Sequence, residues 1–336
     1  MGLTAIFTLK ELTQRSQILR AALVVTIVGL VFQCVYDLMQ GLTPEMFDRS
    51  HYTYIAVSGV LLLFAYPIMY VIERIFGFTS NVTLTELSTI NNSLMRRLSK
   101  LAQGTFNHSM QVGNLAAEVA DGLGANVQLV RTAALYHDIG KMLNPAYFTE
   151  NQRGHNPHDD LVEQDGITPE EQSAKIIIDH VVQGLKMAEK EGLPRELREF
   201  ITAHHGRGKV KYFYVQWKNN HPGEEIDEEK FTYPGPNPRT REHAIMMMCD
   251  ALEASSRSLK EYSEESLRNL VDKIVDTQVS EGYFEDCDIS FRDIKKAKAI
   301  LVNSLKTIYH TRVAYPELNK EKPRFFSFLD KLEGRR

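Results

Sequence analysis

Residues 134–142 read ALYHDIGKM, and the doublet His137-Asp138 within this stretch is the most informative feature of the chain. Imidazole nitrogens and carboxylate oxygens together suit divalent transition metals such as manganese, iron, zinc and nickel. Further histidines and an aspartate occur in helix-compatible apolar sequence on both sides of the doublet. In chain order these are His108, His180, His204, His205 and Asp250. One doublet is weak evidence, but the ordered series predicts a metal site assembled from several helices.

Two members of this series stand in strongly apolar sequence. His180 follows three isoleucines and precedes two valines, and Asp250 follows three methionines and a cysteine. A buried imidazole or carboxylate without a partner is costly, and one shared metal cluster would satisfy both. A single helical histidine is more often a surface or core residue than a ligand, so the prediction depends on the whole set. Two such metals about 3.5–4 Å apart form a clamp for displacement at phosphorus.

Most of the chain after residue 97 has the apolar spacing of helices. Several of the expected helices end at a glycine, and Ser290 with Asp293 has the pattern of a capping box. The absence of a βαβ pattern, a P-loop and a GxGxxG motif excludes the usual nucleotide-binding folds. We therefore predict an all-α domain, in which residues 217–241, rich in proline, glycine and acid, form a loop over the site.

Length and charge set limits on the function. The chain has 336 residues, enough for a catalytic domain and a smaller part, and a formal net charge of −4, which disfavours a bulk nucleic-acid binder. The three cysteines, Cys34, Cys249 and Cys287, have no paired spacing, so neither a disulfide framework nor a thiolate zinc site is expected. This fits a reducing compartment for the large domain.

Two apolar runs precede this domain. The runs AALVVTIVGLVFQCVY (21–36) and SHYTYIAVSGVLLLFAYPIMYVI (50–72) carry no acidic or basic side chain apart from one histidine. A membrane-spanning helix needs roughly 17–25 apolar residues, so we predict two spans, at about 18–38 and 52–75. The alternatives are a cleaved signal peptide, which lacks small residues at the cleavage position here, and buried helices of a soluble protein, which the length of the second run disfavours.

The charge distribution predicts the membrane topology. Basic residues precede the first run and follow the second, whereas the connecting loop is mainly acidic. The positive-inside rule then places both ends in the cytoplasm, and we expect a multi-pass protein of the inner (plasma) membrane. We divide the chain into a membrane region (1–76), a juxtamembrane connector (77–98), a cytoplasmic domain (99–318) and a basic C-terminal tail (319–336). The connector is either a passive tether or a route for a signal.

The sequence motifs that carry a family resemblance are GTFNHSMQVGNLA, NPHDDL, AHHG, VKYFY, FTYPGPNPRTRE and IYHTRVAYP. Through these motifs the chain resembles the HD-domain metal phosphohydrolases, and more closely their seven-transmembrane subgroup. The resemblance runs from about residue 76 to residue 316. It implies an all-α HD-domain helical bundle with a di-metal centre, preceded here by two transmembrane helices. Known members hydrolyse cyclic di-AMP to linear pApA, which is the activity that we expect.

The resemblance also implies how the ligands divide between two metal ions. It assigns four to the first ion: His108, His137, Asp138 and Asp250. Asp138 would bridge to a second ion, whose remaining ligands are His180, His204 and His205. Manganese or iron are the expected ions. A hydroxide between them is the expected nucleophile, because metal binding lowers the pKa of water from about 15.7 to about 7.

Two basic residues are expected to contact the substrate phosphate. Lys141 lies one helical turn beyond His137, where we expect a catalytic as well as a binding role. Arg257 lies two turns beyond Asp250 and would make a forked phosphate contact. The alternative for both side chains is a solvated helix face.

Three further residues match the subgroup motifs. Tyr233 either stacks on a base, an interaction of about 1–3 kcal/mol, or packs the loop. His155 and His158 are expected to support the ligands or fix a loop rather than to bind metal. One departure is Asn107, which stands where the subgroup has the first histidine of its HHS word.

Two other departures bear on function. The GYP signature of the related cyclic di-GMP hydrolases is absent, and only two of the usual seven spans are present, so we expect a chain truncated at its N-terminus or one that has lost its sensing half. The alternatives are an HD hydrolase of guanosine tetraphosphate, cyclic di-GMP or a deoxynucleotide, and a non-catalytic nucleotide-sensing receptor. The expected partners are cyclic di-AMP and the lipid bilayer, and the sequence leaves a homo-oligomer open.

Overall fold

The structure is a computed structural model that describes residues 2–9, 16–90 and 92–309. Within these residues the chain is helical, and the only extended pairings are two isolated bridges, Gln164 with Ile167 and Lys209 with Thr232. The predicted all-α class is confirmed for the described part of the chain. The predicted tail (319–336) and most of the IYHTRVAYP word lie outside the described residues.

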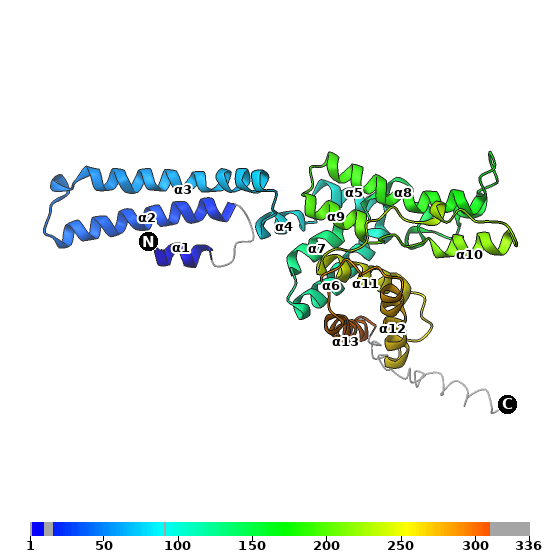
Figure 1. Ribbon diagram of the computed structural model, residues 1–336. Helices are drawn as coiled ribbons and strands as arrows, with labels where there is room; N and C mark the ends of the chain where they lie inside the picture. The colour runs from blue at the N-terminus through cyan, green and yellow to red at the C-terminus, as the bar shows by residue number, and fades with distance from the viewer. Residues whose placement is uncertain (1, 10–15, 91, 310–336) are drawn as a thin grey trace, which may run out of the picture.

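The N-terminal region is a hairpin of two long helices that stands away from the rest of the molecule (Figure 1). Its helices are α2 (Ser16–Met39) and α3 (Arg49–Phe76), with the short α1 (Gly2–Leu9) against α2. The helices approach closely at Gly59, where a Cβ would lie 2.2 Å from Thr26 Oγ1. Tyr52 donates a hydrogen bond of 2.8 Å to Asp37 next to the connecting loop.

Many apolar side chains of the hairpin face outward. Phe32 and Phe64, for example, are 67% and 55% exposed. Leu19–Met39 is a stretch of 21 residues with a mean hydropathy of 2.0, long and apolar enough to cross a membrane. It corresponds to the first predicted span. Within the described residues it is the one candidate of this kind, so the second span, which falls on α3, stays a prediction.

The other α-helices that the structure describes form one domain. They are α4 (Asn81–Leu87), α5 (Ser93–Leu101), α6 (Gln103–Leu123), α7 (Val127–Tyr136), α8 (Pro169–Lys190), α9 (Arg195–Ala203), α10 (Lys211–Asn220), α11 (Arg241–Ser256), α12 (Glu264–Ser280) and α13 (Phe291–Ile308). The 3-10 helices of this domain are η2 (Ile139–Leu143), η3 (Pro145–Tyr147), η4 (Thr149–Asn151), η5 (Pro157–Asp160) and η6 (Glu228–Phe231), and a further one, η1 (Pro44–Met46), lies in the hairpin loop. The expected capping box of Ser290 and Asp293 begins α13.

Helix α6 is the centre of the domain, because α5, α7, α11 and α13 all pack against it. The main hydrophobic core lies between these helices, where side chains such as Val112, Tyr136 and Ile245 are fully buried. A second, smaller core joins α8 and α10 to the segment around Phe231 and Tyr233. The site described below lies where these two cores meet.

The segment predicted as a connector packs as part of the domain. Leu84 of α4 is 1% exposed and belongs to the main core, as does Leu94 of α5. Tyr136 at the end of α7 donates a hydrogen bond of 2.7 Å to the carbonyl oxygen of Leu87, and Thr132 donates one of 3.2 Å to that of Leu84. The C-terminal part of α7, which leads into His137-Asp138, is therefore hydrogen-bonded to α4, the helix that follows the N-terminal hairpin.

Candidate metal centre

The seven predicted ligands lie together in one cluster, although they come from five parts of the chain. His108 lies in α6, His180 in α8 and Asp250 in α11, while His137-Asp138 follow α7 and His204-His205 follow α9. Two groups have ligand atoms that all lie within 4.8 Å of one another. One group is His108, His137, Asp138 and Asp250; the other is Asp138, His180, His204 and His205.

Asp138 belongs to both groups, and its two carboxylate oxygens face different ones. Oδ2 lies 3.2 Å from His137 Nε2 and 3.6 Å from His108 Nε2. Oδ1 lies 3.3 Å from His180 Nε2 and 3.6 Å from His204 Nε2. The side chain of Asp138 is 1% exposed. A single buried carboxylate is thus placed between two sets of imidazoles.

The close approach of Asp138 and His180 depends on a glycine. Gly140 of η2 packs directly on the backbone of α8: a Cβ at this position would lie 1.9 Å from the carbonyl oxygen of His180 and 2.7 Å from the nitrogen of Gly184. No larger residue fits without moving one of the two elements. Gly140 of the HDIGK motif therefore sets the distance between His137-Asp138 and His180 of α8.

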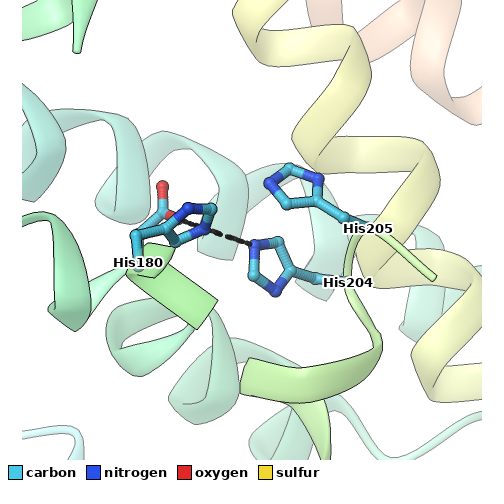
Figure 2. A group of neighbouring side chains, drawn as sticks. His180, His204 and His205 are labelled. Atoms are coloured by element: carbon cyan, nitrogen blue, oxygen red, sulfur yellow. Dashed lines mark hydrogen bonds and ion pairs between the residues drawn. The ribbon is translucent and has the colours of Figure 1, made fainter. Parts of the chain in front are cut away.

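Three of the imidazoles are oriented by their own helices. The Nδ1 atoms of His137, His180 and His204 donate hydrogen bonds of 2.7, 2.5 and 2.9 Å to the carbonyl oxygen three residues earlier. This leaves Nε2 of each ring to face the cluster, as is usual for histidines that bind metal. Figure 2 shows the rings of His180, His204 and His205 converging on one space, with the Nε2 atoms of His180 and His204 3.3 Å apart.

Buried polar atoms in the cluster lack hydrogen bonds. Nε2 of His137 and both carboxylate oxygens of Asp138 make none within the described residues, although charged groups lie within 4 Å. Such atoms are rare in folded proteins, and coordination to a metal ion would satisfy them. The donor set of imidazoles and carboxylates is that of a divalent transition metal. The residues present therefore fit a divalent metal centre.

The electrostatics differ between the two groups. Burial favours neutral imidazoles, but the carboxylates of Asp250 and Asp138 outweigh it and raise the pKa of His108 to about 9 and of His137 to about 10. Burial would also raise the pKa of both carboxyl groups, yet the neighbouring cations hold these pKa values well below the usual range. Burial lowers the pKa of His204, so this imidazole is neutral, as metal binding requires.

Lys141 is part of the cluster rather than of a solvated helix face. Its Nζ lies 2.7 Å from Asp138 Oδ2 and 3.1 Å from Glu150 Oε1, and its side chain is 12% exposed. Burial favours the neutral amine, but these carboxylates prevail and raise the pKa of Lys141. Arg257 instead pairs with Glu253, and its guanidinium is partly exposed.

Two cavities open beside the cluster, and His205 and Asp250 line both of them. One has a volume of about 350 Å³; its further lining includes Tyr233, Tyr283 and Lys209. The other has a volume of about 440 Å³ and is lined by Lys141 and Arg257 among others. The predicted substrate-contacting residues therefore divide between the two sides of the cluster.

The remaining predicted residues lie at different distances from the cluster. The ring of Tyr233 packs against that of His205, with centroids 4.3 Å apart, so the loop that carries it reaches the site as expected. His158 packs against Tyr147 and Phe213 and fixes the loop near η3. His155 lies at the surface, where it pairs with Asp160, and the structure does not bring it to the cluster.

Two carboxylates that touch the site, the buried Glu253 and the partly buried Glu150, were not predicted from the sequence. Glu253 contacts His108, and Glu150 contacts Lys141 and the hydroxyl of Thr105. The spacing of Glu253 offers a signal, because residues three apart share a helix face with Asp250. Nothing in the sequence marks Glu150, since its position depends on how η4 packs against α6.

Comparisons with known proteins agree with this geometry. The HD domain family model matches residues 105–255, and the model for 7TM receptors with an intracellular HD hydrolase matches residues 1–80. The cyclic-di-AMP phosphodiesterase PgpH of Listeria monocytogenes is 34% identical over 94% of this chain and 43% of its own length. The protein of the same name from Bacillus subtilis is 34% identical over 95% of this chain and 44% of its own. The chain thus spans less than half the length of these relatives.

Solved structures show the same fold. The crystal structure of the L. monocytogenes PgpH HD domain has 38% sequence identity and a TM-score of 0.60, and the match covers 66% of this chain and all of that one. A second structure of that domain, in complex with cyclic di-AMP, matches with a TM-score of 0.61 over 67% of this chain and all of that one. The predicted HD-domain helical bundle is confirmed. The chain belongs to the HD-domain family.

Proposed function

We propose that the chain is a membrane-anchored, metal-dependent phosphodiesterase that hydrolyses cyclic di-AMP to pApA. The observation that carries this proposal is the position of Asp138, a buried carboxylate whose two oxygens face separate sets of histidines. The similarity to proteins described as cyclic-di-AMP phosphodiesterases, one of them solved with cyclic di-AMP, supports the choice of substrate.

The seven clustered residues would hold two divalent ions, which we propose to be manganese or iron, with Asp138 shared between them. Two such ions would supply an activated water and neutralise charge on the phosphoryl oxygens. The chain itself contributes the fixed geometry: backbone carbonyls set the tautomers of three imidazoles, and burial excludes bulk water from the carboxylates.

The substrate would lie across the cluster, with the phosphodiester to be cleaved at His205 and Asp250 and one nucleoside half in each adjoining cavity. Lys141 and Arg257 would then attract the phosphate from the larger cavity, Lys141 as a point charge and Arg257 through forked hydrogen bonds. Tyr233 would border the other nucleoside. His158 would act only by fixing the loop around Tyr147.

The same proposal includes location. With a candidate span in α2 and a match to the seven-transmembrane receptor model, the hairpin would anchor the HD domain on the cytoplasmic face of the membrane. The basic flanks of the hairpin and the acidic loop support this orientation.

The test is turnover by the full chain in detergent micelles or nanodiscs. The manganese- or iron-loaded protein is incubated separately with cyclic di-AMP, cyclic di-GMP and guanosine tetraphosphate, and the products are separated chromatographically. We expect pApA from cyclic di-AMP, and none from the Asp138→Ala variant. Absence of pApA with both metals would refute the proposal. Equal turnover by the variant would refute the role of Asp138, and faster turnover of another nucleotide would refute the substrate.

A further inference from the structure

We infer that Glu253 is a positioning residue that joins the metal centre to the phosphate-binding side of the active site. Only the part of this inference that concerns substrate binding rests on the proposed substrate, cyclic di-AMP. Glu253 lies on α11, three residues after Asp250, and is 5% exposed. A carboxylate this deeply buried requires partners, and the structure shows what they are.

Each oxygen of Glu253 has its own partner. Oε2 lies 2.5 Å from Nδ1 of His108. Oε1 accepts hydrogen bonds from Arg257, of 3.0 Å from Nε and 2.5 Å from Nη2. One carboxylate thus holds a predicted metal ligand with one oxygen and a predicted substrate contact with the other.

His108 differs from the other three oriented histidines in the group that accepts its Nδ1 hydrogen bond. His137, His180 and His204 donate Nδ1–H to a backbone carbonyl, whereas His108 donates to a charged side chain. This bond turns Nε2 of His108 toward Asp250, 2.8 Å away. A carboxylate in this position also makes the imidazole a stronger electron donor, and removing such a partner typically weakens metal binding roughly 10- to 100-fold.

The contact between Glu253 and Arg257 places the guanidinium at the edge of the cavity of about 440 Å³ beside the cluster. Arg257 follows the last residue of α11, and its side chain is 39% exposed; among the described residues, its ion pair and side-chain hydrogen bonds are all with Glu253. The fork to Oε1 fixes the plane of the guanidinium beside the cavity that Lys141 also lines. Of the five N–H donors of an arginine, those not used by Glu253 remain available to a phosphate. A fixed guanidinium loses less conformational entropy when the substrate binds.

The experiment compares three variants of the full chain: Glu253→Gln, Arg257→Met and the exposed control Glu265→Gln. Manganese affinity is measured by calorimetry without substrate, and KM and kcat for cyclic di-AMP are measured at saturating manganese. Glu253→Gln should weaken manganese binding roughly 10- to 100-fold and raise KM about 10-fold. Arg257→Met should raise KM similarly but leave manganese affinity unchanged, and the control should change neither.

The double variant tests whether the two residues act as one unit. If Glu253 acts on the substrate through Arg257, Glu253→Gln with Arg257→Met should raise KM no further than Arg257→Met alone. If the Glu253→Gln protein has native circular dichroism and binds manganese as tightly as the parent does, Glu253 does not support metal binding through His108. This result would overturn the metal-binding part of the inference. Additive effects on KM would overturn the substrate-binding part. Calorimetry measures manganese binding without turnover. The effect of Glu253 on metal binding is therefore tested even if cyclic di-AMP is not the substrate.

Discussion

Asp138 has the most demanding role of any single residue, because two sets of imidazoles and Lys141 all face its carboxylate. Asp138→Asn preserves the shape of the side chain but removes the charge that two ions would share. We expect turnover to fall by more than about 100-fold, the upper range for loss of residues that only support a ligand. The bound metal should fall below two ions per chain. Elemental analysis of the purified variant, with the parent as control, measures this; an unchanged metal content would contradict the bridging role.

Metal removal should destabilise the folded chain. The buried carboxylate of Asp138 and the buried imidazoles around it would be stabilised by any ion that binds only the native state. At a free manganese concentration 100 times the dissociation constant, the expected gain is about 2.7 kcal/mol per site. Thermal unfolding with manganese and with a chelator tests this expectation. The same melting temperature in both would show that no ion binds the folded cluster.

At the residue scale, the sequence predicts the candidate metal ligands better than it predicts the side chains that hold residues of the site in place. His180 and Asp250 could be chosen because a titratable residue in an apolar run is unusual and needs a partner. Glu150 could not, because it reaches Lys141 only through the packing of η4 against α6. The substrate contact of Arg257 stays a prediction. Its pairing with Glu253 has a signal in the sequence, because a glutamate four residues before an arginine lies on the same helix face.

At the scale of elements, the distance between η2 and α8 controls the cluster. Gly140→Ala would force a Cβ against the backbone of α8, which cannot move without shifting His180. We expect a loss of about 1–3 kcal/mol of unfolding free energy, as for overpacked cores, together with weaker metal binding. Gly113→Ala in α6 is the matched control: its Cβ would make ordinary van der Waals contacts, 3.4 Å from the Cβ of Ala134 and 3.4 Å from the carbonyl oxygen of Arg131. Chemical denaturation compares the two, and equal stability of parent and Gly140→Ala would contradict this packing.

The helices themselves follow from the spacing of apolar residues, and the capping box of Ser290 and Asp293 marks the start of α13 as predicted. The 3-10 segments after the doublet were beyond prediction, since short turns of this kind have weak local signals. The polar composition of residues 77–98 predicts a connector, but Leu84 and Leu94 place α4 and α5 in the main core. The sequence does carry a signal for α5, because Leu94, Met95 and Leu98 have the spacing of one face of a helix.

At the scale of the whole molecule, the hairpin determines where the reaction would take place. We expect both ends of the hairpin in the cytoplasm and its loop outside. With the native cysteines replaced by serine, Glu45→Cys in the loop should react with a membrane-impermeant maleimide in intact cells. Lys186→Cys on the helical domain should react only after the cells are permeabilised. The reverse pattern would contradict the predicted topology.

We propose that the cluster around Asp138 binds two ions that share this carboxylate. The most direct test is a crystal structure of the manganese-loaded protein with anomalous scattering data recorded at the manganese edge. We predict two anomalous peaks about 3.5–4 Å apart, with one between His108, His137 and Asp250, the other between His180, His204 and His205, and Asp138 touching both. A single peak, or two peaks without Asp138 between them, would contradict the claim.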